Sequence, residues 1–240
     1  MQYKTFIVDY DGTFYRSEKE LNENMDLVKK LRQQGHQFMI ATGRGHDSFA
    51  REMVKHQFEY DYLILCSGAL ILNKNNERLH HFSMSHHNSE KLNQIIKTYN
   101  DNLVSERYIY LDFVDQYYLP NEPLLKVAYT FQKQDKNLTL KKVLEEEFKN
   151  VFNVYYIAGT THDYIEIIAK NIHKGIAIMY LRDLGLLNNE IFVLGDSEND
   201  LEMIDMFDGY LISNHQVQSK KSYKIIESFE ELIKVNVGKI

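Results

Sequence analysis

The residues with the clearest chemical capability are two acids that follow an apolar segment near the start of the chain. Residues 6–8 predict a buried strand, and Asp9 and Asp11 come directly after it, with Gly12 and Thr13 favouring a turn. Residues two apart on a strand share a face. Two carboxylates about 4 Å apart repel by roughly 4 kcal/mol at an effective dielectric of about 20. Such a pair either retains a proton or binds a cation, unless the acids only form a polar strand end with an Asx turn.

Two further segments contain groups that suit a phosphate. Thr42, Gly43 and Arg44 follow a second expected strand, where a hydroxyl and backbone N–H groups meet the start of a helix. Lys174 lies just before another expected helix, where its charge opposes the helix dipole. Taken singly, a helix cap at Thr42 and a solvated lysine at 174 are the simpler interpretations. Together they predict a site for an anion.

The segment Gly195–Asp200 adds more acids after a strand. If all four segments share one edge of a sheet, the carboxylates of Asp9, Asp11, Asp196 and Asp200 converge there. Four carboxylates without a cation are untenable by the repulsion given above. Hard oxygen ligands suit Mg²⁺, which binds through one or two carboxylates, waters and a substrate phosphate. This combination predicts a metal-assisted phosphoryl-transfer site with a carboxylate nucleophile.

The elements that position these residues alternate between strands and helices at both ends of the 240-residue chain. This alternation is typical of parallel βαβ units. We expect strands at 36–41, 62–66, 191–194 and 210–213, a hairpin at 69–82, and helices at 21–34, 47–56, 175–184, 201–207 and 227–235.

The middle of the chain has a different pattern, which predicts an antiparallel sheet with helices on one face. We expect helices at 88–99 and 138–149 and strands at 107–113, 116–119, 124–131, 151–158 and 163–169. The predicted fold class is therefore α/β, a Rossmann-like parallel-sheet core with an inserted α+β domain. We expect residues 1–82 and 170–240 to form the core and residues 83–169 to form the insertion.

Composition restricts the partners. The formal net charge of −6 argues against a general nucleic-acid binder, which needs a basic field. The single Cys66 has no partner for an internal disulfide, which favours a cytoplasmic location. No apolar segment approaches the roughly 20 residues that span a bilayer, and the first residues lack a signal-peptide pattern. We therefore expect neither nucleic acid nor membrane as a partner.

The four segments, in this order, resemble the signature motifs of the haloacid dehalogenase-like hydrolases, and the insertion resembles the IIB cap of the Cof-type phosphatases. The resemblance implies that Asp9 is the nucleophile that becomes aspartyl-phosphate and that Asp11 is the general acid and base. It implies that the phosphoryl group contacts Thr42, Gly43, Lys174 and Asn199. It also implies a magnesium site made of Asp9, Asp11 through its carbonyl, Asp196 and Asp200.

The expected function is a magnesium-dependent phosphatase that hydrolyses a small phosphorylated metabolite, such as a sugar phosphate, a nucleotide or a cofactor precursor. A sugar phosphomutase and a non-catalytic phospho-ligand sensor are the alternatives. Relatives usually carry Asn-Gly-Ala where this chain has Ser67-Gly68-Ala69, which places a shorter side chain near the expected site entrance. The cap residues expected to contact a polar substrate are Arg107, Lys126, His162 and Tyr164. The sequence leaves open the oligomeric state and any metal role of residues 80–87.

Overall fold

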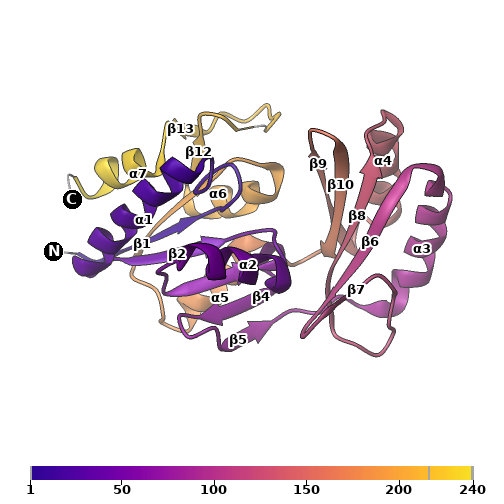
Figure 1. Ribbon diagram of the computed structural model, residues 1–240, viewed down its shortest axis with the longest axis horizontal. Coiled ribbons are helices and arrows are strands. Elements are labelled where there is room, and N and C mark those ends of the chain that lie inside the picture. Colours follow the sequence, from indigo (N-terminus) through magenta and orange to yellow (C-terminus); the bar gives the residue numbers. More distant parts are fainter. Residues whose placement is uncertain (1, 216, 239–240) are drawn as a thin grey trace. The chain divides into compact units, whose positions relative to one another are not determined.

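The computed structural model describes residues 2–215 and 217–238. The chain forms two compact units (Figure 1). The first combines residues 1–80 with 173–240, and the second comprises residues 81–172. The second unit is therefore inserted into the first, and each is described by itself below.

The first unit is built on an eight-stranded sheet with the strand order β13-β12-β11-β1-β2-β3-β4-β5. Its strands from β13 to β3 run parallel, and β4 turns back antiparallel to β3. The strands are β1 Lys4–Val8, β2 Gln37–Ala41, β3 Tyr62–Leu65, β4 Leu70–Asn73, β5 Arg78–His81, β11 Glu190–Gly195, β12 Tyr210–Ile212 and β13 Lys224–Ile226. The expected α/β core is thus confirmed, with β1 between two parallel neighbours near the middle of the sheet.

The helices of this unit pack against the sheet through apolar faces. Ser17 begins the first helix, because its hydroxyl accepts a hydrogen bond from the Glu20 N–H at 3.2 Å. Phe38 on β2 contacts Phe229, the first residue of the last helix, and their ring centroids lie 5.5 Å apart. The last helix therefore covers the sheet at β2. The helices are α1 Glu18–Gln33, α2 His46–His56, α5 Lys174–Asp183, α6 Leu201–Phe207 and α7 Phe229–Asn236.

The second unit is a five-stranded sheet with the order β7-β6-β8-β10-β9, all antiparallel. Its elements are α3 Ser89–Lys97, β6 Leu103–Tyr110, β7 Val114–Asp115, β8 Leu124–Gln132, α4 Lys136–Glu147, β9 Phe152–Ala158 and β10 His162–Ala169. Helices α3 and α4 lie on the same face of this sheet (Figure 1). This is the expected α+β insertion.

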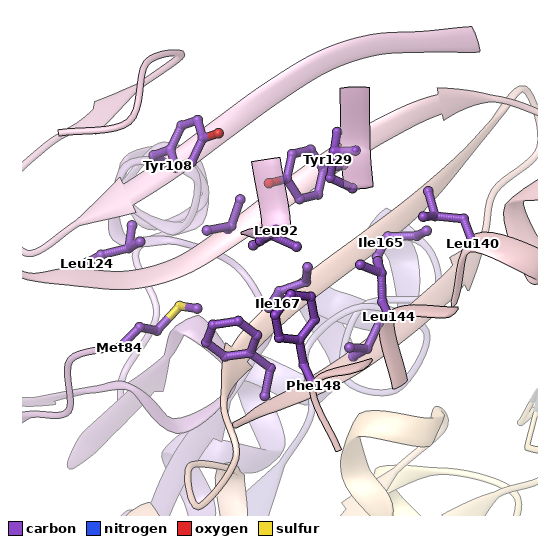
Figure 2. Close-up of a cluster of buried hydrophobic side chains, with 14 of the residues drawn as sticks. Met84, Leu92, Tyr108, Leu124, Tyr129, Leu140, Leu144, Phe148, Ile165 and Ile167 are labelled. Carbon is purple, nitrogen blue, oxygen red and sulfur yellow. The ribbon is translucent and has the colours of Figure 1, made fainter. Parts of the chain in front are cut away.

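The core of the second unit lies between that face and the two helices. Leu92 of α3 and Leu140 and Leu144 of α4 pack against Tyr129 and Ile165 of the sheet (Figure 2). Because side chains alternate along a strand, the residues between these inward positions form the opposite, helix-free face of the sheet.

One expected strand is absent from the described residues, and one strand was not expected. The strand expected at 116–119 is not formed within the described chain, and the short β7 precedes it instead. The reason is the Tyr110 hydroxyl, which donates to the Tyr117 carbonyl at 3.2 Å and accepts from the Leu119 N–H at 2.5 Å. These backbone groups are satisfied by a side chain, so no strand partner is required. The unexpected strand is β13, which is only three residues long and too short for a pattern of alternation.

Candidate active site

The site is formed where neighbouring parallel strands end. Val8 pairs with Leu194 of β11 and with Ile40 of β2, so the three strands end side by side. The Asp9 N–H donates to the Leu194 carbonyl at 2.9 Å, which continues the ladder by one residue. Asp9, Asp196 and Thr42 therefore follow the carboxyl ends of adjacent strands, where open α/β sheets bind their ligands.

Lys174 links the first and last motifs. It is the first residue of α5 and is fully buried. Its Nζ donates to Asp9 Oδ1 at 2.5 Å and to Asp200 Oδ1 at 2.6 Å. Burial alone lowers the pKa of this amine, but the two carboxylates outweigh burial and raise the pKa above its ordinary value. Lys174 is therefore a permanent cation in the interior.

The carboxylates of Asp9, Asp196 and Asp200 form a buried cluster, with one oxygen of each within 4.8 Å of the others. Burial, and then repulsion from Asp200 and Asp196, raises the pKa of Asp9 despite the attraction of Lys174. Burial and then Asp200 raise the pKa of Asp196 to about 7. One lysine does not neutralise three carboxylates, so the ionised cluster would carry an excess of negative charge. A hard divalent cation would balance this excess.

The members of the cluster differ in how free their oxygens are. Asp200 Oδ2 accepts hydrogen bonds from the Asp196 N–H, the Ser197 N–H and the Ser197 hydroxyl at 3.0–3.1 Å. Its other oxygen accepts from Lys174, so Asp200 holds the lysine and the loop together. Among the described residues, the Asp196 carboxylate forms a long hydrogen bond, in which Oδ1 accepts from the Thr13 hydroxyl at 3.3 Å. Asp9 and Asp196 are therefore better suited than Asp200 to bind a metal.

Gly12 allows Asp196 to approach the first motif. Its φ of +79° is favoured by glycine. A Cβ atom at this position would lie 2.3 Å from Asp196 Oδ2, which is shorter than any real contact. The glycine after the two acids is therefore required by the close packing of the site as well as by the turn.

Asp11 lies apart from the three-acid cluster, because Arg44 binds its carboxylate. Arg44 Nε donates to Asp11 Oδ2 at 2.7 Å and Nη2 donates to Oδ1 at 2.6 Å, a bidentate pair. Arg44 Nη1 also donates to Glu52 Oε1 at 2.6 Å. Sequence reasoning assigned no role to Arg44 or Glu52, because neither spacing nor residue type indicates where a long side chain points.

The remaining phosphate-binding candidates are placed as follows. Thr42 is buried, and its Oγ1 accepts a hydrogen bond from the Arg44 N–H at 3.2 Å. Gly43 lies between them in a bend of the chain. Asn199 directly precedes Asp200 in the chain and is buried. Its Oδ1 accepts a hydrogen bond from the Ser197 hydroxyl at 2.8 Å. Their contacts to a phosphoryl group stay predictions.

Ser67, which was expected near the site entrance, has a buried side chain. Ser67 is only 1% exposed, and its N–H donates to the Thr42 carbonyl at 3.0 Å. Its φ is +55°, a conformation that few non-glycine residues adopt. Among the described residues its hydroxyl has no hydrogen-bond partner. The turn after β3 therefore buries this side chain beside the phosphate-binding candidate Thr42.

The four cap residues expected to contact substrate share one face of their sheet. Each lies one residue away along its strand from an inward-facing position, so all four are on the helix-free face. They are Arg107, Lys126, His162 and Tyr164. Lys126 is ion-paired with Glu166 Oε1 at 2.5 Å on this face.

Comparison with known proteins identifies the family. The model of the haloacid dehalogenase-like hydrolases matches residues 6–118 and 104–228. The chain belongs to this family, and the expected hydrolase class is confirmed.

Relatives and solved structures agree with this family. A Bacillus subtilis protein named "Putative phosphatase YxeH" is 27% identical over 231 residues, covering 85% of this chain and 84% of that protein. The phosphoglycolate phosphatase of Methanosarcina acetivorans is 29% identical over 206 residues, covering 85% and 80%. The crystal structure of TM0651 from Thermotoga maritima has a TM-score of 0.68 at 23% identity, covering 93% and 91%. The likeness to TM0651 supports the fold, and the names of the two relatives support a phosphatase.

Among residues 2–215 and 217–238, every helix is too short or too polar to cross a bilayer.

Proposed function

We propose that the chain is a cytoplasmic, magnesium-dependent phosphatase that hydrolyses small phosphate monoesters through an aspartyl-phosphate at Asp9. The observation that carries this proposal is the buried contact between Lys174, Asp9 and Asp200, with Asp196 in the same cluster. A lysine held against a carboxylate nucleophile and an acid-rich pocket is suited to stabilise a transferring phosphoryl group.

In the first half-reaction an oxygen of Asp9 attacks phosphorus. The new Asp9–phosphorus bond forms as the bond between phosphorus and the alcohol oxygen breaks, and Asp11 gives its proton to that oxygen. In the second half-reaction water attacks phosphorus, Asp11 takes the water proton, and the bond to Asp9 breaks. The products are the alcohol, inorganic phosphate and the regenerated Asp9 carboxylate.

The other residues hold the phosphoryl oxygens. Lys174 supplies a cation, and Thr42 and the backbone at Gly43 supply donors at the start of the second motif, with Asn199 beside them. Asp9 and Asp196 would hold Mg²⁺ together with the main-chain carbonyl of Asp11. When bound, the ion neutralises the negative charge that builds up on the phosphoryl group.

The substrate class rests on the relatives and on charge. The name of the Methanosarcina relative concerns a small phosphorylated acid. The cap residues expected to contact a polar metabolite, Arg107, Lys126, His162 and Tyr164, share the helix-free face of the inserted sheet, where Lys126 is buried and paired with Glu166. The single cysteine, Cys66, is buried and forms no disulfide, as is usual in a reducing cytoplasm.

The test is turnover of a panel of phosphate monoesters, with p-nitrophenyl phosphate as a general reporter. We expect phosphate release with Mg²⁺, loss of release with EDTA, and loss of release in Asp9→Asn. The control is Asp205→Asn, which changes an acid that pairs with Lys221 on the surface. Wild-type protein that releases no phosphate from any member of the panel would favour a sensor over an enzyme. Phosphate transfer within a sugar phosphate, without net release, would favour a phosphomutase.

A further inference from the structure

The Arg44 guanidinium, which binds the Asp11 carboxylate, is itself held in place by other side chains. Its Nη1 is bound to Glu52, which also accepts a hydrogen bond from the Tyr10 hydroxyl at 3.0 Å. The guanidinium carbon lies 5.0 Å from the centre of the Tyr10 ring, a cation–π distance. These contacts hold the guanidinium whether or not Asp11 is engaged, so its two donors toward Asp11 are preorganised.

We propose that Arg44 is a positioning residue that holds Asp11 as the base of the second half-reaction, the hydrolysis of the aspartyl-phosphate. This inference rests on the proposed function. Both oxygens of Asp11 accept hydrogen bonds from the same guanidinium, which fixes the position and the plane of the carboxylate. Each oxygen keeps a further lone pair that can accept a proton from a water molecule.

The balanced step is as follows. The oxygen of a water molecule forms a bond to the phosphorus of aspartyl-phosphate, and Asp11 accepts the water proton. The bond between phosphorus and Asp9 breaks, and its electron pair returns to the Asp9 carboxylate. The proton on Asp11 then passes to the next leaving alcohol or to solvent.

Loss of Arg44 should therefore slow one half-reaction more than the other. With p-nitrophenyl phosphate the leaving nitrophenolate needs no proton, so formation of aspartyl-phosphate does not depend on Asp11. Hydrolysis of aspartyl-phosphate still requires a placed base, and a placed acid or base accelerates a reaction by about 10²–10⁴-fold. A misplaced Asp11 retains part of this effect, so we expect hydrolysis to slow by about 10- to 100-fold.

The experiment measures both half-reactions of purified full-length protein with Mg²⁺. Rapid quenching gives the rate at which protein-bound phosphate forms and decays, and steady-state assays give kcat and KM. For Arg44→Gln we expect slower decay, a burst of one nitrophenolate per protein, and kcat and KM that fall together while kcat/KM stays unchanged. Arg44→Lys keeps the charge without the fork, and we expect an intermediate decay rate.

The matched control is Arg51→Gln. Arg51 is an exposed arginine on α2 that forms a long ion pair of 3.7 Å with Asp47. We expect this variant to behave as wild type. If Arg44→Gln does not fold, Arg44→Lys decides the question by the same pattern of kcat and KM.

Three results would overturn the inference. A higher KM with unchanged kcat would mean that Arg44 binds substrate, and an equal fall of kcat and kcat/KM would place its effect in the first half-reaction. Decay at the wild-type rate in folded Arg44→Gln would remove its role altogether. Wild-type protein that forms no protein-bound phosphate contradicts the proposed function itself, which separates the two failures.

Discussion

Lys174 Nζ lies 2.5 Å from Asp9 Oδ1, although the two residues are 165 positions apart in the chain. The entire inserted unit lies between them in sequence. The contact forms because α5 begins beside the carboxyl end of β1, and it leaves Lys174 as the cation shared by Asp9 and Asp200 in the buried cluster.

Removing the lysine charge should destabilise the protein strongly. Lys174→Met leaves buried carboxylates without their cation, and breaking a buried pair in this way typically costs about 3–5 kcal/mol in the free energy of unfolding. Lys221→Met is the control, because the Lys221–Asp205 pair is exposed and screened by solvent, so its loss should change the free energy of unfolding little. Urea unfolding in EDTA measures both. Equal losses would mean that the cluster does not depend on the lysine.

Gly12→Ala should weaken magnesium binding. The new Cβ would meet Asp196 Oδ2 at 2.3 Å, so the carboxylate must move away from Asp9. Gly185→Ala is a matched control, since Gly185 also has a positive φ, +70°, but has nothing within 4 Å of the added atom. Calorimetric titration with Mg²⁺ should show weaker binding only for Gly12→Ala. Wild-type affinity in this variant would contradict the proposed ligand role of Asp196.

Magnesium should stabilise the protein more at pH 8 than at pH 5. Asp196 ionises near 3.8 when unfolded and near 7 when folded, so its pKa is raised on folding. The contribution of Asp196 to the stability of the metal-free protein is therefore fully present below the unfolded value and is lost as the pH rises through about 7. Mg²⁺ requires the ionised carboxylates, so its effect increases over the same window.

The measurement is the melting temperature with Mg²⁺ and with EDTA across this pH range. At a hundredfold excess over Kd the stabilisation is about 2.7 kcal/mol. At roughly 2–4 °C per kcal/mol this corresponds to a rise in Tm of roughly 5–10 °C at pH 8. An equal or larger rise at pH 5 would contradict this account of the cluster.

Ser67→Ala should leave stability unchanged. The buried hydroxyl lacks a partner among the described residues, so removing it costs no hydrogen bond. We expect the free energy of unfolding to stay within about 0.5 kcal/mol of wild type. Ser17→Ala is the control and should cost about 1 kcal/mol, because it removes the cap of α1. A loss at Ser67 as large as at Ser17 would reveal a partner for its hydroxyl.

Sequence reasoning predicted the meeting of Asp9, Asp196 and Thr42 for a simple reason. Neighbouring parallel strands end at the same edge of a sheet, so residues that follow them are brought together whatever their separation in sequence. The approach of Gly12 to Asp196 and the ionic contacts of Lys174 depend on the same topology. Periodicity was therefore enough to indicate the acid cluster.

Other features depend on side-chain contacts that spacing does not encode. The prediction of a strand at 116–119 was wrong because backbone groups of this segment form hydrogen bonds with the Tyr110 hydroxyl. The pairing of Asp11 with Arg44 depends on the direction of a long, flexible side chain. The burial of Ser67 depends on a turn in which this residue adopts a positive φ. A glycine in the sequence would have suggested this conformation, but a serine does not.

The most direct test of the proposed chemistry is to locate the phosphoryl group on the protein. Asp11→Asn removes the base that hydrolyses aspartyl-phosphate, so this variant should accumulate it when given p-nitrophenyl phosphate and Mg²⁺. After acid quenching and proteolysis, mass spectrometry should find phosphate on the peptide that contains Asp9, at close to one per protein. Phosphate on another residue, or turnover by wild type with none on Asp9 in this variant, would contradict the proposed nucleophile.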